Sequence, residues 1–475
     1  MSDETPNLLP PAEDPSDRPK WRHWTWWLQP KVALPLVLSV LLLLSPFLVR
    51  RWHLSQIPDI ADPFDVEAFL SETVEDKDNA FVDYEAAAKL LVPIALTQKE
   101  WNEEVSGKSW DQTSPTVRVW LDANQLALER WRSGTDKGEA FDGDSRDSFL
   151  MSHHPSAQTL RDLLALSRLQ GERQHAEGRM AEAWQWYRGL MRFGHHFARQ
   201  RTDWSGRVFG DAFHKEAAMR VVPWASDPRT NAELLQSSLK QLTEDAHLRH
   251  PFVEYLKGEY CVLQRLERFS AQRKPPSFIP ADGSSWNDSR LGRYCLAEPE
   301  LSFRWNKLVT ENWLSGSAIP RRSQHRITDK FRTLLDVTAP GSHISCNELL
   351  LLSDKRSFMN FVEMRDKFDT GLARQETLRL TLACQLWFRQ RGTFPDKLED
   401  LVPGVVSELP IDPFSKLGEA FRYRRDSDEV VVYSVGIDET DDLGRVDEKD
   451  RDIGYRIVPP RIREPVSEQK PVDVP

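Results

Sequence analysis

"WRHWTWWLQPKVALPLVLSVLLLLSPFLVRRW", residues 21–52, contains the apolar run that decides how this chain is organised. Residues 32–49 carry no charge, eight of these 18 residues are leucine, and a helix of that length spans about 27 Å. The hydrocarbon core of a bilayer is about 30 Å thick, so the run predicts a transmembrane helix, which we place at residues 31–51. No small-x-small cleavage site follows it, so we expect an uncleaved single-pass signal anchor and not a secretory signal peptide.

The residues on either side of the run predict its orientation. Four tryptophans precede it and Trp52 follows it, as in the aromatic belts that mark the two headgroup layers. Arg50 and Arg51 follow the run, whereas the amino side carries Arg18, Lys20, Arg22 and Lys31. Because positive charge favours the cytoplasmic side, we expect the amino terminus inside and the bulk of the chain outside the cytoplasmic (inner) membrane, in the cell envelope.

Composition excludes some partners. The chain has 475 residues, 40% of them hydrophobic, and a net charge of -10. A chain without a basic surplus lacks the phosphate-neutralising residues that nucleic acid binding requires, so no nucleic acid partner is expected. Residues 426–452 hold 11 acidic and three basic residues, which suggests either a hard cation or simple solubility. The four cysteines form no close C-x-x-C pair, although Cys295 and Cys346 could form a disulfide.

We expect a mainly α fold, with a helical external domain packed as hairpins or a bundle. Apolar residues recur at helical spacing over residues 160–169 and 183–198, on either side of Gly178, which predicts an antiparallel helical hairpin. The expected organisation is a disordered cytoplasmic tail (1–30), the transmembrane helix (31–51), a membrane-proximal helical region (52–150), a helical domain (151–375), a small α+β module (376–457) and a disordered tail (458–475).

One stretch of the helical domain has a repeat-like pattern. "AEGRMAEAWQWYRGLMRF", residues 176–193, resembles the turn and second helix of a tetratricopeptide unit. Because no second copy occurs at a 34-residue period, a plain helical hairpin is the preferred interpretation and a solenoid is not supported.

The pattern changes near residue 376. A helix is predicted to end at "RGTFPDKLEDLVP", residues 391–403, because Gly392 suits a left-handed cap and Pro395 cannot continue a helix. Residues 421–425 and 430–434 then have strand composition, and the Asp-Ser-Asp sequence between them favours a turn. The module is therefore predicted to contain a β-hairpin.

The order of these segments, with "DPF" at 412–414, "FRYRR" at 421–425 and "YSVGID" at 433–438, resembles the globular module of major pseudopilins of the bacterial type II secretion system. The same residues are also similar to C-terminal segments of uncharacterised bacterial single-pass membrane proteins. The resemblance covers residues 376–444, about a seventh of the chain. The sequence shows no short basic leader or prepilin peptidase site, so we expect the module to serve as a fold without a role in pilus assembly.

The resemblance implies a calcium site. In those pseudopilins the loop after the tyrosine-serine-x-glycine step wraps a calcium ion, which by position implicates Asp438, Asp441 and Asp442. Calcium takes about six to eight oxygen ligands, and three close aspartates can supply part of that shell. The alternative is a solvated acidic loop that caps a hairpin.

No motif identifies a reaction, a catalytic residue or an organic cofactor. The pairs His153-His154 and His195-His196 lack an H-E-x-x-H pattern, and adjacent helical side chains point about 100° apart, so a shared metal ion is disfavoured. Neither a P-loop lysine nor a G-x-S-x-G elbow occurs. We expect an envelope interaction or scaffold protein that contacts the lipid bilayer through residues 31–51 and binds a protein partner. The alternatives are an ancillary component of a secretion or pilus-type assembly, and an unrecognised hydrolase.

Overall fold

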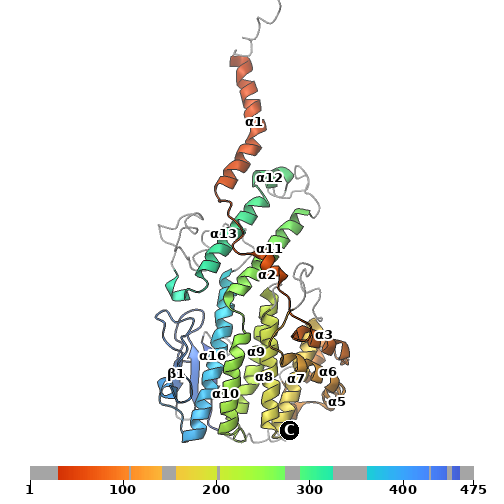
Figure 1. The fold of residues 1–475 in the computed structure, drawn as a ribbon, viewed down its shortest axis with the longest axis vertical. Coiled ribbons are helices and arrows are strands. Elements are labelled where there is room, and N and C mark those ends of the chain that lie inside the picture. The colour runs from red at the N-terminus through yellow and green to blue at the C-terminus, as the bar shows by residue number, and fades with distance from the viewer. Residues whose placement is uncertain are drawn as a thin grey trace, which may run out of the picture. The chain divides into compact units, whose positions relative to one another are not determined.

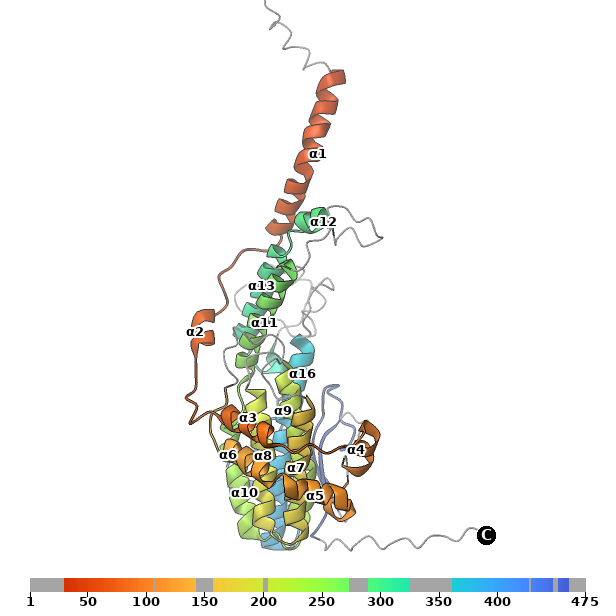
Figure 2. The same cartoon turned by 90° about the vertical axis from the view of Figure 1, so that its right-hand side faces the viewer.

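The computed structural model describes residues 30–105, 108–141, 157–199, 204–272, 289–324, 361–426, 429–446 and 452–460. The chain divides into an anchor unit, Met1–Pro58 with Phe269–Arg304, and a main unit, Asp59–Arg268 with Trp305–Pro475. The described residues are mainly helical, with a small antiparallel sheet near the carboxyl terminus, as Figure 1 and Figure 2 show. The predicted fold class is therefore confirmed. Both predicted disordered tails lie almost entirely outside the described residues.

The anchor unit begins with helix α1, Pro30–Ser55. Residues Ala33–Ser55 have a mean hydropathy of 2.1, and none of the apolar window is buried against the rest of the chain. The helix contains two prolines, and Ser39 Oγ donates to the carbonyl of Pro35 at 2.8 Å while Ser45 Oγ donates to that of Leu42. These serine bonds satisfy backbone carbonyls that lie in apolar surroundings. Among the described residues, α1 is the helix that is long and apolar enough to cross a membrane.

Short helices form the membrane-proximal region of the sequence, and longer ones follow. The other α-helices in the described part of the chain are α2 Val66–Ser71, α3 Ala80–Leu90, α4 Gln98–Glu104, α5 Pro115–Ala123, α6 Gln125–Thr135, α7 Ala157–Ala176, α8 Met180–Ala198, α9 Trp204–Ser226, α10 Ala232–Asp245, α11 Phe252–Gln272, α12 Arg290–Cys295, α13 Glu300–Gly316 and α16 Phe361–Arg391. The 3₁₀ helices are η3 Trp110–Gln112, η4 Ala246–Leu248, η6 Arg321–Ser323 and η7 Leu398–Leu401.

Helices α7, α8 and α9 form the centre of the main unit, and the predicted hairpin corresponds to α7 and α8. Gly178 has a φ of +80° in the turn between them, a conformation that glycine adopts at little cost. Trp184 on α8 stacks on Trp224 on α9 with ring centroids 5.2 Å apart, and both side chains are fully buried. Where α8 and α9 cross, a Cβ on Gly194 would stand 2.6 Å from the Gly210 carbonyl, so only glycine permits this approach.

The sheet lies against α16, and its strands are β1 Arg422–Arg425, β2 Val430–Ser434 and β3 Ile453–Ile457, antiparallel in that order (Figure 1). The β1–β2 hairpin confirms the sequence prediction. Strand β2 is the central strand, paired with β1 and β3, and all of its residues are buried. Helix α16 packs against it. Strand β3 was not predicted, since its short sequence "IGYRI" follows directly on the acidic stretch.

Helix α16 runs without a break through residues 375 and 376, where the sequence pattern changes and where we placed a domain boundary. It packs against α9 and α10 and also against β2 and β3. Gln385, in its second half, donates both to Ser226 Oγ on α9 and to the carbonyl of Val458, which follows β3. Buried residues of the helical region and of the sheet module belong to one hydrophobic cluster. The second half of α16 therefore contacts the helices and the sheet at the same time.

Candidate functional site

The three predicted calcium ligands lie in the loop between β2 and β3. Four of its residues have positive φ, namely Gly436, Glu439, Leu443 and Gly444. At Gly444 a Cβ would stand 3.0 Å from the Tyr433 ring, so the close approach of backbone and ring also requires glycine. These left-handed residues fold the loop back toward the end of the sheet.

Two of the three aspartates take part in neighbouring sets of hydrogen bonds, Asp441 through its carboxylate and Asp442 through its backbone amide. Asp441 Oδ1 accepts from the Tyr433 hydroxyl at 3.0 Å and from the Leu443 amide at 2.9 Å. The Asp442 amide donates to Asp452 Oδ1 at 3.4 Å, and the Gly444 amide donates to Asp452 Oδ2 at 2.8 Å. Asp452 stands just before β3, and it is the residue that sequence reasoning missed. Only a prediction of β3 could have placed it beside the loop.

Asp438, the third predicted ligand, forms a separate local hydrogen bond. Asp438 Oδ1 accepts from the Thr440 amide at 3.2 Å, a local turn contact. The neighbouring Glu439 forms an ion pair with Lys416 at 3.1 Å and approaches Arg321 Nε at 3.6 Å. These two pairs fix the outer part of the loop to other elements of the main unit.

Negative charge accumulates around the Asp452 carboxyl group. Burial raises the pKa of Asp452, and the nearby charges of Asp441 and Asp442 raise it further, against the lowering effect of the two amide donors. The Asp442 Oδ2 atom is buried and has no hydrogen-bond partner. A cation would relieve this repulsion, although the described residues contain no group of three or more His, Cys, Asp or Glu side chains arranged to hold a metal. The calcium site stays a prediction, since residues 447–451 of the same loop lie outside the described residues.

Asp412 holds the base of the loop in place. It is 1% exposed, and its carboxylate accepts from the Ser434 hydroxyl at 2.7 Å, the Val435 amide at 3.1 Å and the Phe414 amide at 2.9 Å. Burial raises its pKa, and the three donors oppose that effect. The "DPF" segment is therefore a hydrogen-bonded clamp that joins the 411–420 loop to the end of β2.

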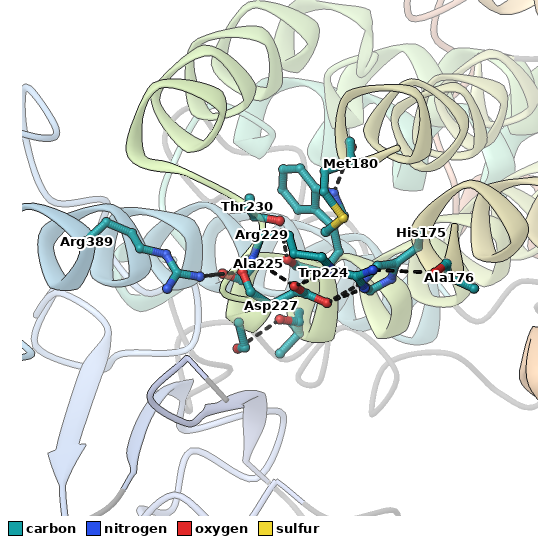
Figure 3. A network of polar contacts seen from close by, with 11 residues as sticks. His175, Ala176, Met180, Trp224, Ala225, Asp227, Arg229, Thr230 and Arg389 are labelled. Carbon is teal, nitrogen blue, oxygen red and sulfur yellow. Dashed lines mark hydrogen bonds and ion pairs between the residues drawn. The ribbon is translucent and has the colours of Figure 1, made fainter. Parts of the chain in front are cut away.

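A second polar network joins the ends of three helices in the main unit (Figure 3). Asp227 Oδ2 lies 3.2 Å from His175 Nε2 and 2.8 Å from Arg229 Nη2, and Arg389 Nη2 donates to the Asp227 carbonyl at 2.5 Å. Burial alone would raise the pKa of Asp227, but hydrogen bonds from Arg229 and His175 hold it below its ordinary value. Trp224 Nε1 donates to the Met180 carbonyl beside it. These contacts tie the α7–α8 turn, the α9–α10 turn and α16 together, which is a structural role.

The described histidine pair points in two directions. His196 Nδ1 lies 2.6 Å from the Tyr84 hydroxyl, whereas the His195 ring faces the His214 ring at 5.8 Å. The two rings of the pair therefore contact different partners. His153 and His154 lie outside the described residues.

A buried cationic cluster surrounds Phe368 on α16. The guanidinium groups of Arg249 and Arg207 lie 4.5 Å and 5.1 Å from the centre of its ring, and Arg207 also pairs with Asp211 at 3.1 Å. Burial, together with the charge of Arg207, lowers the pKa of Arg249 to about 9. Sequence reasoning missed this cluster, because its members are distant in the chain and resemble ordinary surface residues.

Comparison of the chain with protein-family models, with curated proteins and with solved structures finds no match.

Proposed function

We propose that this protein is a membrane-anchored interaction or scaffold protein of the cell envelope. One observation carries the proposal: no residue in the apolar window of α1 is buried, although soluble chains bury such surface. In water this surface would be unfavourable by about 25 cal/mol for each Å². A bilayer is the environment in which a helix of this length and composition is stable.

The proposed orientation has the amino terminus in the cytoplasm and the main unit outside the inner membrane. It rests on the excess of Lys and Arg before the apolar run over those that follow it. Trp52, which is 59% exposed at the carboxyl end of α1, fits an aromatic belt at the outer headgroup layer.

Exposed apolar residues on the sheet module support a role in protein binding. Leu417 is 82% exposed, Leu443 is 66% exposed, and Ile411 and Ile437 are about half exposed. They lie on two loops that Asp412 joins by its hydrogen bonds to Ser434 and Val435. Large apolar side chains that a structured loop holds in solvent are typical of surfaces that contact another protein.

The alternative proposal, an ancillary component of a secretion or pilus-type assembly, has one observation in its favour. In the module a long helix, α16, packs on an antiparallel sheet, and the "DPF" clamp and the Tyr433–Asp441 bond lie at the end of that sheet. This arrangement is compatible with the resemblance to pseudopilins, and recovery of the chain with secretion machinery would support it.

The anchor can be tested in the full-length chain with matched arginine substitutions. Leu42→Arg with Leu43→Arg places two charges on residues that are 75% and 72% exposed on α1, whereas Leu417→Arg places one on an exposed loop. Each arginine at the middle of a span opposes insertion by about 2.5–3.5 kcal/mol. We expect wild type and Leu417→Arg to remain in carbonate-washed membranes and the double variant to be lost from them. Equal recovery of all three would refute the anchor.

Orientation and partner binding need separate measurements. A carboxyl-terminal alkaline phosphatase fusion should be active, and a fusion to a reporter that works only in the cytoplasm should be inactive. The reverse result would refute the orientation. A photo-crosslinking residue at 417 or 443 should capture a reproducible protein partner, and Lys240, 77% exposed on α10, offers a control position. Absence of any such product would count against a scaffold.

A further inference from the structure

The anchor unit contains a second segment that packs on the end of α1. Arg50 Nη1 donates to the Tyr294 carbonyl at 3.1 Å, its Nη2 pairs with Glu300 at 2.8 Å, and the Phe47 and Tyr294 rings meet edge to face at 5.7 Å. Arg304 donates to the carbonyls of Leu54 and Ile57, both at 3.2 Å. Residues 289–304, which we call the collar, are thus fixed to the carboxyl end of α1.

The place of the collar along α1 sets its depth in a bilayer. Phe47 belongs to the uncharged run, which ends at residue 49. Arg50 follows Phe47 by three positions in the helix, which is about 4.5 Å along the axis. The ring of Tyr294 lies beside Phe47, and its carbonyl lies beside the Arg50 guanidinium. If α1 spans a membrane, Tyr294 stands at the boundary between hydrocarbon and headgroups.

The exposed side of the collar contains aromatic and arginine residues, which are common where hydrocarbon meets the lipid headgroups. In α12, Arg290 and Tyr294 are exposed and stand one helical turn apart, and Arg293 is partly exposed next to them. Aromatic rings with a polar end settle at the headgroup layer, and arginines there bind lipid phosphates. Arg51 and Trp52, both exposed at the end of α1, add to the same belt.

We propose that the collar lies in the headgroup layer of the membrane that α1 crosses, with Tyr294 at the hydrocarbon boundary and Arg290 and Arg293 on anionic lipid headgroups. The inference rests on the proposed anchor. The exposed side of the collar is continuous with the membrane-spanning part of α1, so we infer that its partner is lipid. A surface fixed to the last turns of a transmembrane helix lies next to the bilayer. Two stretches about 240 residues apart in sequence would then form one membrane-contacting unit.

The test uses the full-length chain in nanodiscs of phosphatidylcholine, with or without phosphatidylglycerol. A photo-crosslinking amino acid replaces Leu42, Arg290 or Leu417 in turn, and all other residues stay native. Mass spectrometry then counts lipid adducts at each position. We expect adducts to acyl chains from position 42, adducts near the glycerol and headgroup from position 290, and no lipid adducts from position 417.

The outcomes separate the inference from the anchor. Adducts from position 42, together with none from position 290, would overturn the collar and leave the anchor standing. An absence of adducts from position 42 would refute the anchor itself.

A charge reversal tests the role of the arginines. Arg293→Glu should lower the adduct yield at position 290 about fivefold for each unit of charge in discs with phosphatidylglycerol, and much less in discs without it. Lys240→Glu, a charge reversal on α10 of the main unit, should leave the yield unchanged. An unchanged yield with Arg293→Glu would overturn the proposed contact with anionic headgroups.

Discussion

Mild acid should destabilise the main unit, because this unit buries histidines as neutral groups. Burial lowers the pKa of His196 and of His214 to about 3 each, with nearby arginines contributing, and it lowers the pKa of His195 well below its ordinary value. The ordinary value is 6.5. A folded-state pKa below the unfolded one means that the unfolded chain binds more protons between pH 6.5 and about 3. Stability is therefore fully present above pH 6.5 and is lost as the pH falls.

The magnitude follows from the two pKa values. A group with a pKa of about 3 when folded and 6.5 when unfolded lowers the free energy of unfolding by about 2 kcal/mol between pH 7 and about pH 5. His196 and His214 together give about 4 kcal/mol, and His195 acts in the same direction. Buried carboxyl groups with raised pKa, such as Asp369 and Asp412, act in the opposite direction. A comparison of variants is needed to isolate the histidines.

The assay is urea unfolding of the full-length chain in detergent, followed by tryptophan fluorescence at pH 7 and about pH 5. Wild type loses unfolding free energy between pH 7 and about pH 5, and in His214→Gln this loss should be smaller by about 2 kcal/mol. The comparison does not depend on how the substitution changes stability at pH 7. His247, exposed on η4, is the matched control, and His247→Gln should keep the wild-type pH dependence. The reasoning would be wrong if His214→Gln showed the same pH dependence as wild type.

Three further predictions concern the main unit. Asp412→Ala leaves three donors without an acceptor and should lower the free energy of unfolding by about 3 kcal/mol or more, whereas the exposed Asp426→Ala should change little; equal effects in urea titrations would contradict the clamp. Gly371→Ala puts a Cβ 2.6 Å from Asp211 Oδ1 and should destabilise by about 1–3 kcal/mol, and a stabilised variant would show that the ion pair moves aside freely. Calcium at about 100 times its Kd should stabilise the folded state by about 2.7 kcal/mol and so raise the melting temperature. Asp442→Asn should abolish this rise. If calcium does not raise the melting temperature of wild type, the loop is a solvated turn and not a calcium site.

Local patterns in the sequence predicted the elements whose structure depends on near neighbours. The apolar face of residues 183–198 and the turn at Gly178 define α7 and α8, and the hairpin of β1 and β2 follows from strand composition on either side of the Asp-Ser-Asp turn. Helix α1 also follows from local composition, and its serine hydroxyls bond to carbonyls three or four residues before them in the same helix. Each of these signals lies within one or two turns of the residues that it organises.

Long-range pairing explains what was missed. The first half of α16 carries Arg365 and Asp369, which suggest a surface helix, yet Asp369 is 1% exposed. It pairs with Arg365 at 2.9 Å one helical turn before it, and the charges of Arg321 and Arg249, which are distant in the chain, also favour its ionised form. Burial raises the pKa of Asp369 in spite of that pair. Similarly, Asp452 reaches the acidic loop only because β3 pairs with β2. Charge in the sequence does not reveal whether a partner across the fold will allow its burial.

The collar extends this point to the membrane. Glu300 lies between Arg50 at 2.8 Å and Arg304 at 2.8 Å, so one carboxylate holds together two stretches that composition alone would assign to different regions. A chain that begins at residue 52 would keep Glu300 but lose Arg50, and it would also lose the Phe47 ring that packs on Tyr294. The anchor therefore does more than tether the chain. Its last turns complete the packing of the collar, and we expect the collar to be structured only when α1 is present.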